Sequence, residues 1–290
     1  MCKTMYNKSS LLLLLGLCFL FIPCSPYYGH FHPRASHAGE YVRAPWSIRY
    51  RRYNHRKGPI WKSIRRLIAQ HYQATKKSPG KCKAKAPSIK QDDRHGFERN
   101  CLARNHIVEE GNWLLGRLNG VWNIKTFQGH PIAQIPYVKG RLEGTLKVWH
   151  RNGKPWVSCD FRNEYKHGVC WWWHFNGKPL SVGTYRDNDR HGKVIHWFRS
   201  GKKLSSCTYK YDQAQGHCFR WYQNGQKLWD RFYDQGKAVG TWKMWFKNGQ
   251  LMSIRHFEKG KPCGVSKFWL DDGKLVNTGK FPPCKKPTRL

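Results

Sequence analysis

Aromatic residues return at a fixed step of 24 positions through two-thirds of this chain, with β-prone runs between them. One column is made of tryptophans, and the other mixes tryptophan, tyrosine and phenylalanine. The first column is Trp149, Trp173, Trp197, Trp221, Trp245 and Trp269, and the second is Trp113, Tyr137, Phe161, Tyr185, Tyr209, Tyr233, Phe257 and Phe281. No helical period competes within the units, so the pattern predicts stacked β-units that share one core.

Two glycine columns keep the same step, and one of them follows asparagine. The pair Asn248-Gly249 lies between two β-prone runs of about seven residues, which is the pattern of a hairpin. Asn152-Gly153, Asn176-Gly177 and Asn224-Gly225 repeat it, with weaker versions at Gln128-Gly129, Ser200-Gly201 and Asp272-Gly273. Because Asn-Gly favours a two-residue type I′ turn, we expect about eight hairpins over residues 92–281.

A two-residue turn centred on Asn-Gly also predicts the strand register. It places Trp173 opposite Leu180 and Gly168 opposite Tyr185, while a hairpin closed at the other edge places Gly168 opposite Phe161. The equivalent tryptophan pairs are Trp197 with Leu204, Trp221 with Leu228 and Trp245 with Met252. The predicted fold is all-β: an elongated antiparallel sheet or solenoid that curls, or that is covered on one face, since both faces carry apolar side chains.

These residues give the chain a resemblance to a known family. Asn176-Gly177-Lys178 followed by Tyr185, and Gly240-Thr241-Trp242 followed by Trp245, resemble the MORN-repeat variant often labelled a YwqK-type antitoxin. The likeness covers residues 92–281 and implies the fold. For function it implies a scaffold or binding surface, or a toxin-neutralising protein. Tyr185 is followed by Arg186-Asp187 instead of Glu-Gly, so lipid-kinase or phosphoinositide roles do not carry over.

The N-terminus has Lys3 and Lys8 ahead of an apolar run of 12 residues over positions 11–22. This length matches the apolar core of an export signal and is too short for a membrane span. We therefore expect residues 1–24 to be a signal peptide or an uncleaved signal anchor, in a secreted or envelope-associated protein. Cys24 loosely resembles a lipoprotein acceptor, which leaves lipidation as a third alternative.

Residues 25–91 show no repeat phase and are predicted to be a basic, largely irregular linker. Apolar spacing within it predicts a short amphipathic helix over residues 59–73, which either caps the first hairpin or lies on a membrane surface. Residues 282–290 form a C-terminal tail.

Positive charge dominates the chain, with a formal net charge of +36. Residues 1–90 hold 18 Lys or Arg against Glu40 alone, and the remainder holds 35 against 16 acids. This excess favours an anionic lipid or polysaccharide surface before nucleic acid, or else serves only solubility. The candidate binding residues of the linker are Arg49, Arg51, Arg52, Arg56, Lys57, Lys62, Arg65 and Arg66.

The cysteines offer candidate cross-links. Cys159 with Cys170, and Cys207 with Cys218, share one spacing, and the expected register sets each pair directly opposite on neighbouring strands. The pairs are either disulfides, as an exported chain favours, or small buried thiols. Cys82, Cys101, Cys263 and Cys284 have no partner that the pattern assigns.

The tryptophan column also has two interpretations: core packing within the sheet, or a groove of stacked rings between basic side chains, as carbohydrate and single-strand binders use. Motifs for nucleophilic, phosphate-binding or metal-dependent catalysis are not found in the sequence. His95, His167 and His191 stand two or more repeats apart, too far to share a metal.

We therefore expect a non-enzymatic, exported or envelope-associated scaffold without cofactor, metal or small-molecule substrate, which binds a protein partner, an anionic surface, or both. The alternatives are a toxin-neutralising binding protein and a carbohydrate-binding or carbohydrate-active protein.

Overall fold

The computed structural model describes residues 83, 85, 94–102 and 107–284, and this part of the chain forms a sheet of 17 strands. The strands are β1 (Gly96–Leu102), β2 (Ile107–Leu114), β3 (Arg117–Thr126), β4 (Pro131–Val138), β5 (Arg141–Leu142), β6 (Gly144–Trp149), β7 (Pro155–Arg162), β8 (Tyr165–Trp173), β9 (Pro179–Arg186), β10 (Asp189–Trp197), β11 (Lys203–Lys210), β12 (Gln213–Trp221), β13 (Lys227–Asp234), β14 (Lys237–Trp245), β15 (Leu251–Glu258), β16 (Lys261–Trp269) and β17 (Leu275–Lys280). The predicted all-β class is confirmed.

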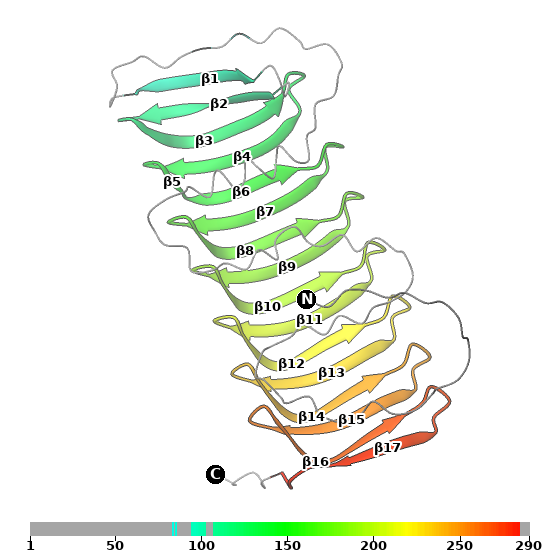
Figure 1. Cartoon of the computed structure of the whole chain (residues 1–290). Coiled ribbons are helices and arrows are strands. Elements are labelled where there is room, and N and C mark those ends of the chain that lie inside the picture. The colour runs from blue at the N-terminus through cyan, green and yellow to red at the C-terminus, as the bar shows by residue number, and fades with distance from the viewer. Residues whose placement is uncertain (1–82, 84, 86–93, 103–106, 285–290) are drawn as a thin grey trace, which may run out of the picture. The chain divides into compact units, whose positions relative to one another are not determined.

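Consecutive strands pair antiparallel, so the sheet is a ladder of hairpins in chain order (Figure 1). The single irregularity in this order is β4, which pairs with the two-residue strand β5 and also with β6. The predicted repeat of one hairpin per 24 residues is therefore present from β1 to β17.

The Asn-Gly turns are three-residue loops, so the predicted type I′ turn is wrong at this edge. The amide of Gly177 donates to the carbonyl of His174 at 2.8 Å, and the amide of His174 donates to the carbonyl of Lys178 at 2.9 Å. Gly177 has a φ of 86°, whereas Asn176 is not among the residues with positive φ. This geometry is a type I turn followed by a left-handed glycine, which adds one residue and a bulge to the hairpin.

The bulge overturns the predicted tryptophan–leucine pairing. Trp173 pairs with Pro179, not Leu180, because the register shifts by one residue at the end of the strand. The same shift occurs at Trp149, Trp197, Trp221, Trp245 and Trp269. Farther from the turn the predicted register is confirmed, since Gly168 pairs with Tyr185.

The asparagines link successive turns. In Asn176, Oδ1 accepts the amide of Lys178 at 3.0 Å, and Nδ2 donates to the carbonyl of Arg199 in the next turn at 2.9 Å. The side chains of Asn152, Asn224 and Asn248 make the same contact to the next turn at 2.8, 2.9 and 2.8 Å. These hydrogen bonds explain why asparagine recurs although its backbone has negative φ.

Type I′ turns occupy the opposite edge of the sheet. Between β9 and β10 the two loop residues Asp187 and Asn188 have φ of 51° and 75°, and Arg186 pairs with Asp189. Leu115, Lys139, Asn163, Glu164, Tyr211, Asp212, Gln235 and Lys259 also have positive φ. Asn-Gly pairs do not mark this edge in the sequence, because these loops carry other residues in the left-handed region.

A second bulge lies near the type I′ edge, and it corrects the expected pairing of Gly168 with Phe161. Phe161 pairs with Lys166, and the register shifts between Cys159 and Phe161. A Cβ on Gly168, whose φ is 110°, would lie 2.9 Å from Oδ2 of Asp160. At this position glycine therefore allows the bulged strand to pass close to its neighbour, whereas the feature that the whole glycine column shares is positive φ.

Burial is uneven along the sheet. Of the 21 buried hydrophobic residues in the described part, 17 lie between Ile107 and Trp172. The most enclosed are Ile132, Ile135 and Cys170, each with 0% exposure. Beyond β9 the strands keep their register but bury few large apolar side chains.

Candidate functional site

The two aromatic columns lie on opposite faces of the sheet, because successive side chains along a strand alternate between faces. We call one side the tryptophan face, which carries Trp149, Trp171, Trp173, Trp197, Phe219, Trp221, Trp245 and Trp269. We call the other side the tyrosine face, which carries Tyr137, Phe161, Trp172, Tyr185, Tyr209, Tyr233, Trp242 and Phe257. All six tryptophans of the predicted column are half-buried, so they belong to neither a closed core nor a fully exposed surface.

Rings on the tryptophan face stack on one another. The ring centroids of Trp171 and Trp173 are 5.8 Å apart with an interplanar angle of 15°, and those of Trp171 and Trp197 are 6.2 Å apart at 12°. Trp171 was not in the predicted column, because it stands two residues before Trp173 on the same strand. The period-two alternation of strands could have identified it.

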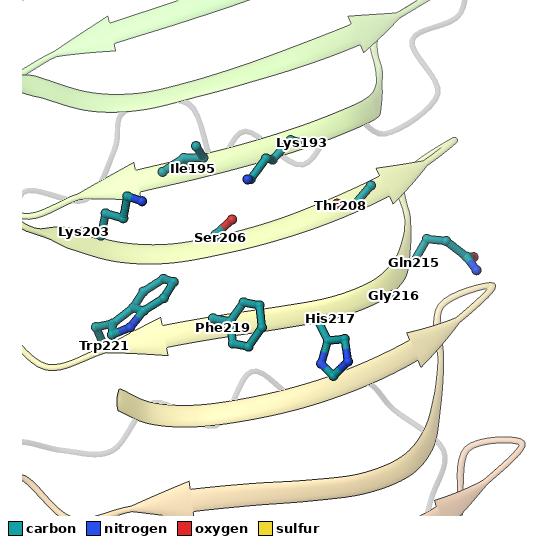
Figure 2. Close-up of a pocket in the computed structure, with 10 residues that line it drawn as sticks. All are labelled: Lys193, Ile195, Lys203, Ser206, Thr208, Gln215, Gly216, His217, Phe219 and Trp221. Atoms are coloured by element: carbon teal, nitrogen blue, oxygen red, sulfur yellow. The ribbon is translucent and has the colours of Figure 1, made fainter. Parts of the chain in front are cut away.

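The stack gives way to a shallow groove beside β12, where His217, Phe219 and Trp221 form a row (Figure 2). Phe219 lies 5.5 Å from His217 and 5.8 Å from Trp221 between ring centroids. The groove has a volume of about 580 Å³ and is also lined by Lys193, Ile195, Lys203, Ser206, Thr208, Gln215 and Gly216. An apolar floor is thus bordered by two lysines.

A further lysine lies over the aromatic row. The Nζ atom of Lys227 is 5.1 Å from the ring centroid of Phe219 and 5.3 Å from that of Trp245. An acid, Asp230, also contacts this part of the face: its carboxylate is 3.0 Å from Nδ1 of His217 and 3.6 Å from Nζ of Lys227. The groove therefore combines exposed aromatic edges with net positive charge.

The tyrosine face carries cations over its rings, a feature that the sequence reasoning missed. The guanidinium carbon of Arg190 is 3.9 Å from the ring centroid of Tyr209, and Nζ of Lys166 is 5.1 Å from that of Tyr185. Such distances are within the range of cation–π attraction. The 24-residue repeat could have identified these two cations, because Lys166 and Arg190 follow Leu142 in one column of the repeat.

Electrostatics differ between these two cations. Burial lowers the pKa of Lys166, and the charge of Asp212 partly opposes this shift. For Arg190, burial acts in the same direction, but the hydrogen bond to Asp212 and the charges of Tyr209, Asp212 and Tyr185 together outweigh burial and raise the pKa. The Nε atom of Arg190 donates to Oδ1 of Asp212 at 2.7 Å. Arg190 is therefore a satisfied structural cation.

The structure joins both candidate cysteine pairs. Disulfides connect Cys159 with Cys170 and Cys207 with Cys218, whose Cα atoms are 4.0 and 4.2 Å apart. A third disulfide, Cys263–Cys284, was not assigned from sequence because its separation of 21 residues follows no repeat spacing. Cys101 is also disulfide-bonded.

Other predicted features lie outside the described residues or are not brought together. The signal segment, the helix over 59–73, Cys24 and the candidate binding residues between Arg49 and Arg66 are outside the described part. Within the described ranges, no three His, Cys, Asp or Glu side chains are grouped to hold a metal ion. The same residues include no helix that is long and apolar enough to cross a membrane.

Three segments of the chain, residues 142–163, 190–211 and 238–259, match the MORN repeat variant family. Each segment contains one hairpin closed at a turn of the Asn-Gly column: β6–β7, β10–β11 and β14–β15. The hairpins between them, β8–β9 and β12–β13, have the same turn geometry and register. No curated protein matches the chain in sequence. The chain is therefore a β-hairpin protein that contains three repeats of the MORN repeat variant family between residues 142 and 259.

Proposed function

We propose that this protein is a non-enzymatic scaffold that binds a protein partner through its tryptophan face. The observation that carries the proposal is the half-buried aromatic stack of Trp171, Trp173 and Trp197, which continues into the row on β12. Tryptophan contributes more than most residues to protein–protein binding, since its large ring is desolvated on contact.

Ring orientation favours a protein over a sugar or a nucleic acid base. Sugars and bases stack on the open face of an aromatic ring. In the stack around Trp171, nearly parallel rings have centroids 5.8 and 6.2 Å apart, which leaves too little room for a sugar or a base to enter between them. The ring edges therefore remain for a partner. Edges of this kind pack against apolar protein side chains.

The positive charge around the groove indicates which charged residues the partner carries. Lys193 and Lys203 line the groove, and Lys227 lies over its aromatic floor. We infer that the partner presents an apolar patch with acidic residues at its rim. Complementary charge at a rim mainly accelerates association and selects the partner.

A crosslinking experiment in the native host tests this proposal. A photoreactive phenylalanine analogue replaces Phe219 on the tryptophan face or, as a matched control, Tyr209 on the tyrosine face. Only the Phe219 position should yield a specific protein adduct. The purified adduct partner should then bind the full chain, and Trp197→Ala should weaken binding by tenfold or more, about 1.4 kcal/mol.

Two results would contradict the proposal. Either Trp197→Ala binds the partner as tightly as the wild type, or the tryptophan-face variants lose binding to a polysaccharide and not to any protein. Trp229→Ala, on the tyrosine face, controls for a general loss of stability.

We also propose that the chain is exported and that its N-terminal segment adheres to anionic surfaces. The support is the short apolar run over residues 11–22 and the 18 basic residues against one acid in residues 1–90. Fractionation of cells that express the tagged chain should place it in the envelope or the medium. Deleting residues 30–91 should remove most salt-sensitive binding to anionic vesicles, whereas a cytoplasmic location would count against export.

A further inference from the structure

Three polar atoms near the end of the tyrosine face are buried and have no hydrogen-bond partner among the described residues: Nε of Arg231, Nε of Arg255 and Oγ of Ser266. Each can donate a hydrogen bond. A buried donor without an acceptor reduces stability, so such groups usually meet a protein, water or ligand acceptor. Three of them within the four successive strands β13–β16 need a common explanation.

The repeat places these three groups together. Arg255 and Ser266 stand 48 residues after Cys207 and Cys218, a pair close enough to form a disulfide. The register of β15 with β16, in which Ile254 pairs with Lys267, continues this relation. Arg255 and Ser266 are therefore cross-strand neighbours.

Trp242 connects Arg231 to this pair. Arg255 pairs with Trp242 across β14 and β15. The guanidinium carbon of Arg231 lies 4.7 Å from the ring centroid of Trp242 and 4.6 Å from that of Trp229. The corresponding atom of Arg255 lies 5.1 Å from the ring centroid of Phe257. Aromatic rings thus hold both guanidinium groups on one face of the sheet.

No carboxylate balances these charges. Among the described residues, neither Arg231 nor Arg255 forms an ion pair, in contrast to Arg190 with Asp212. Burial, together with the charge of Arg231, lowers the pKa of Arg255. Two like charges are therefore held near each other and partly away from water, an arrangement that an anion would stabilise.

We propose that Arg231, Arg255 and Ser266 form a binding site for the phosphate group of a phosphate monoester or of free phosphate. Two guanidinium groups without a carboxylate match a dianion, and the three buried unpaired donor atoms can each reach a different terminal oxygen of a phosphate monoester. A carboxylate offers one charge and two oxygens, which leaves part of the site unsatisfied. This site lies on the opposite face from the proposed protein-binding surface and does not depend on it.

Calorimetric titration of the full chain with inorganic phosphate tests the site, with acetate at the same ionic strength as the carboxylate control. Phosphate should bind and acetate should bind much more weakly. Ser266→Ala is the decisive variant: Ser266 has 0% exposure, so the change removes an unsatisfied hydroxyl and leaves Tm equal or higher. It should nevertheless weaken phosphate binding by about tenfold, the value of one hydrogen bond to a charged group.

Matched controls separate the site from general charge and packing. Ser181→Ala changes another buried serine of the tyrosine face, at 7% exposure, and should leave phosphate binding unchanged. Arg255→Gln and Arg231→Gln should each weaken binding by tenfold or more, whereas Arg186→Gln, which removes an exposed charge of β9, should have little effect.

The affinities of a phosphoserine peptide and of glucose 6-phosphate, each compared with that of inorganic phosphate, then identify the molecule that carries the phosphate group. If a phosphoserine peptide binds more tightly than inorganic phosphate, the source is a protein; if glucose 6-phosphate does, it is a sugar; if neither does, free phosphate is the ligand. The proposal is overturned if phosphate does not bind at millimolar concentration, if acetate binds equally well, or if Ser266→Ala binds phosphate as the wild type does. Water would then be the acceptor for the three buried atoms.

Discussion

The tyrosine face differs between its first half, β2–β8, and its second half, β10–β16. In the first half the face is a packed apolar core that includes Trp122, Ile135 and Val157. In the second half, arginines lie over aromatic rings on the same face, as Arg231 does over Trp242. Ile135 and Arg231 even occupy the same column of the repeat, four units apart.

The backbone pairing and the turns are the same in both halves of the sheet. Gly120 pairs with Tyr137 in the first half as Gly216 pairs with Tyr233 in the second. Turn hydrogen bonds are equally regular, since the turn links of Asn152 and Asn248 are both 2.8 Å long. The repeat therefore needs its turn, glycine and aromatic columns, and the other columns are free to serve either packing or binding.

The largest expected effect compares two residues of one column. Ile135→Ala should lower the free energy of unfolding by about 2–5 kcal/mol, because it removes a fully enclosed side chain. Arg231→Leu should change it by less than about 1 kcal/mol, since the lost cation–π contacts are offset by removal of a buried unpaired donor. Urea unfolding followed by circular dichroism measures both. Equal losses would show that the two halves are packed alike.

The order in which the disulfides are reduced tests the difference in burial between the two halves, because a reductant reaches an exposed sulfur first. Cys159 and Cys170 are 2% and 0% exposed, whereas Cys207 is only half-buried. We expect dithiothreitol to reduce Cys207–Cys218 first, and each bridge should contribute roughly 2–3 kcal/mol by restricting the unfolded chain. Timed alkylation with peptide mapping gives the order, and thermal melts give the size. Simultaneous reduction would contradict the difference in burial.

Gly225→Val tests the turn geometry that both halves share. Gly225 has a φ of 98° and nothing within 4 Å of an added Cβ, so any loss comes from backbone strain alone. The substitution should cost about 1–3 kcal/mol. The neighbouring Gln226→Val serves as control and should cost less. Similar Tm values for the two variants would mean that the turn does not require a left-handed residue.

The asparagine links predict equal effects in the two halves. Asn152→Ala and Asn248→Ala each remove a contact to the next turn, and each should cost about 1 kcal/mol. Thermal melts of both variants provide the comparison. A cost confined to one half would show that turn stability depends on the core beneath it.

The smallest expected effect is acid sensitivity in the first half. Burial favours a higher pKa for Glu110, but the hydrogen bonds and positive charges of Lys125 and Arg99 together outweigh burial and lower the pKa from its ordinary value of 4.5. A carboxyl with a lowered pKa stabilises the fold above its unfolded pKa, and this contribution disappears as pH falls through the folded value. Tm should therefore fall more steeply below pH 4.5 in the wild type than in Glu110→Gln. Parallel curves would contradict this role.

The 24-residue columns were enough to predict the fold and part of the site. They gave the hairpin repeat, the pairing of Gly168 with Tyr185, and the opposition of Cys159 and Cys170. These features follow from local turn preference and alternation, which one sequence displays. The turn type could not be predicted, because a one-residue bulge beside Trp173 depends on hydrogen bonds that Asn-Gly supports in more than one geometry.

By itself, therefore, the sequence determined that the chain is a ladder of β-hairpins of the MORN repeat variant type. Only the tertiary structure decided which face each column occupies, because each bulge shifts the register by one residue. It likewise decided that Trp171 stacks on Trp197 and that Arg231 and Arg255 lie beside Trp242. The members of each set stand on different strands, and they become neighbours only when successive hairpins stack in register.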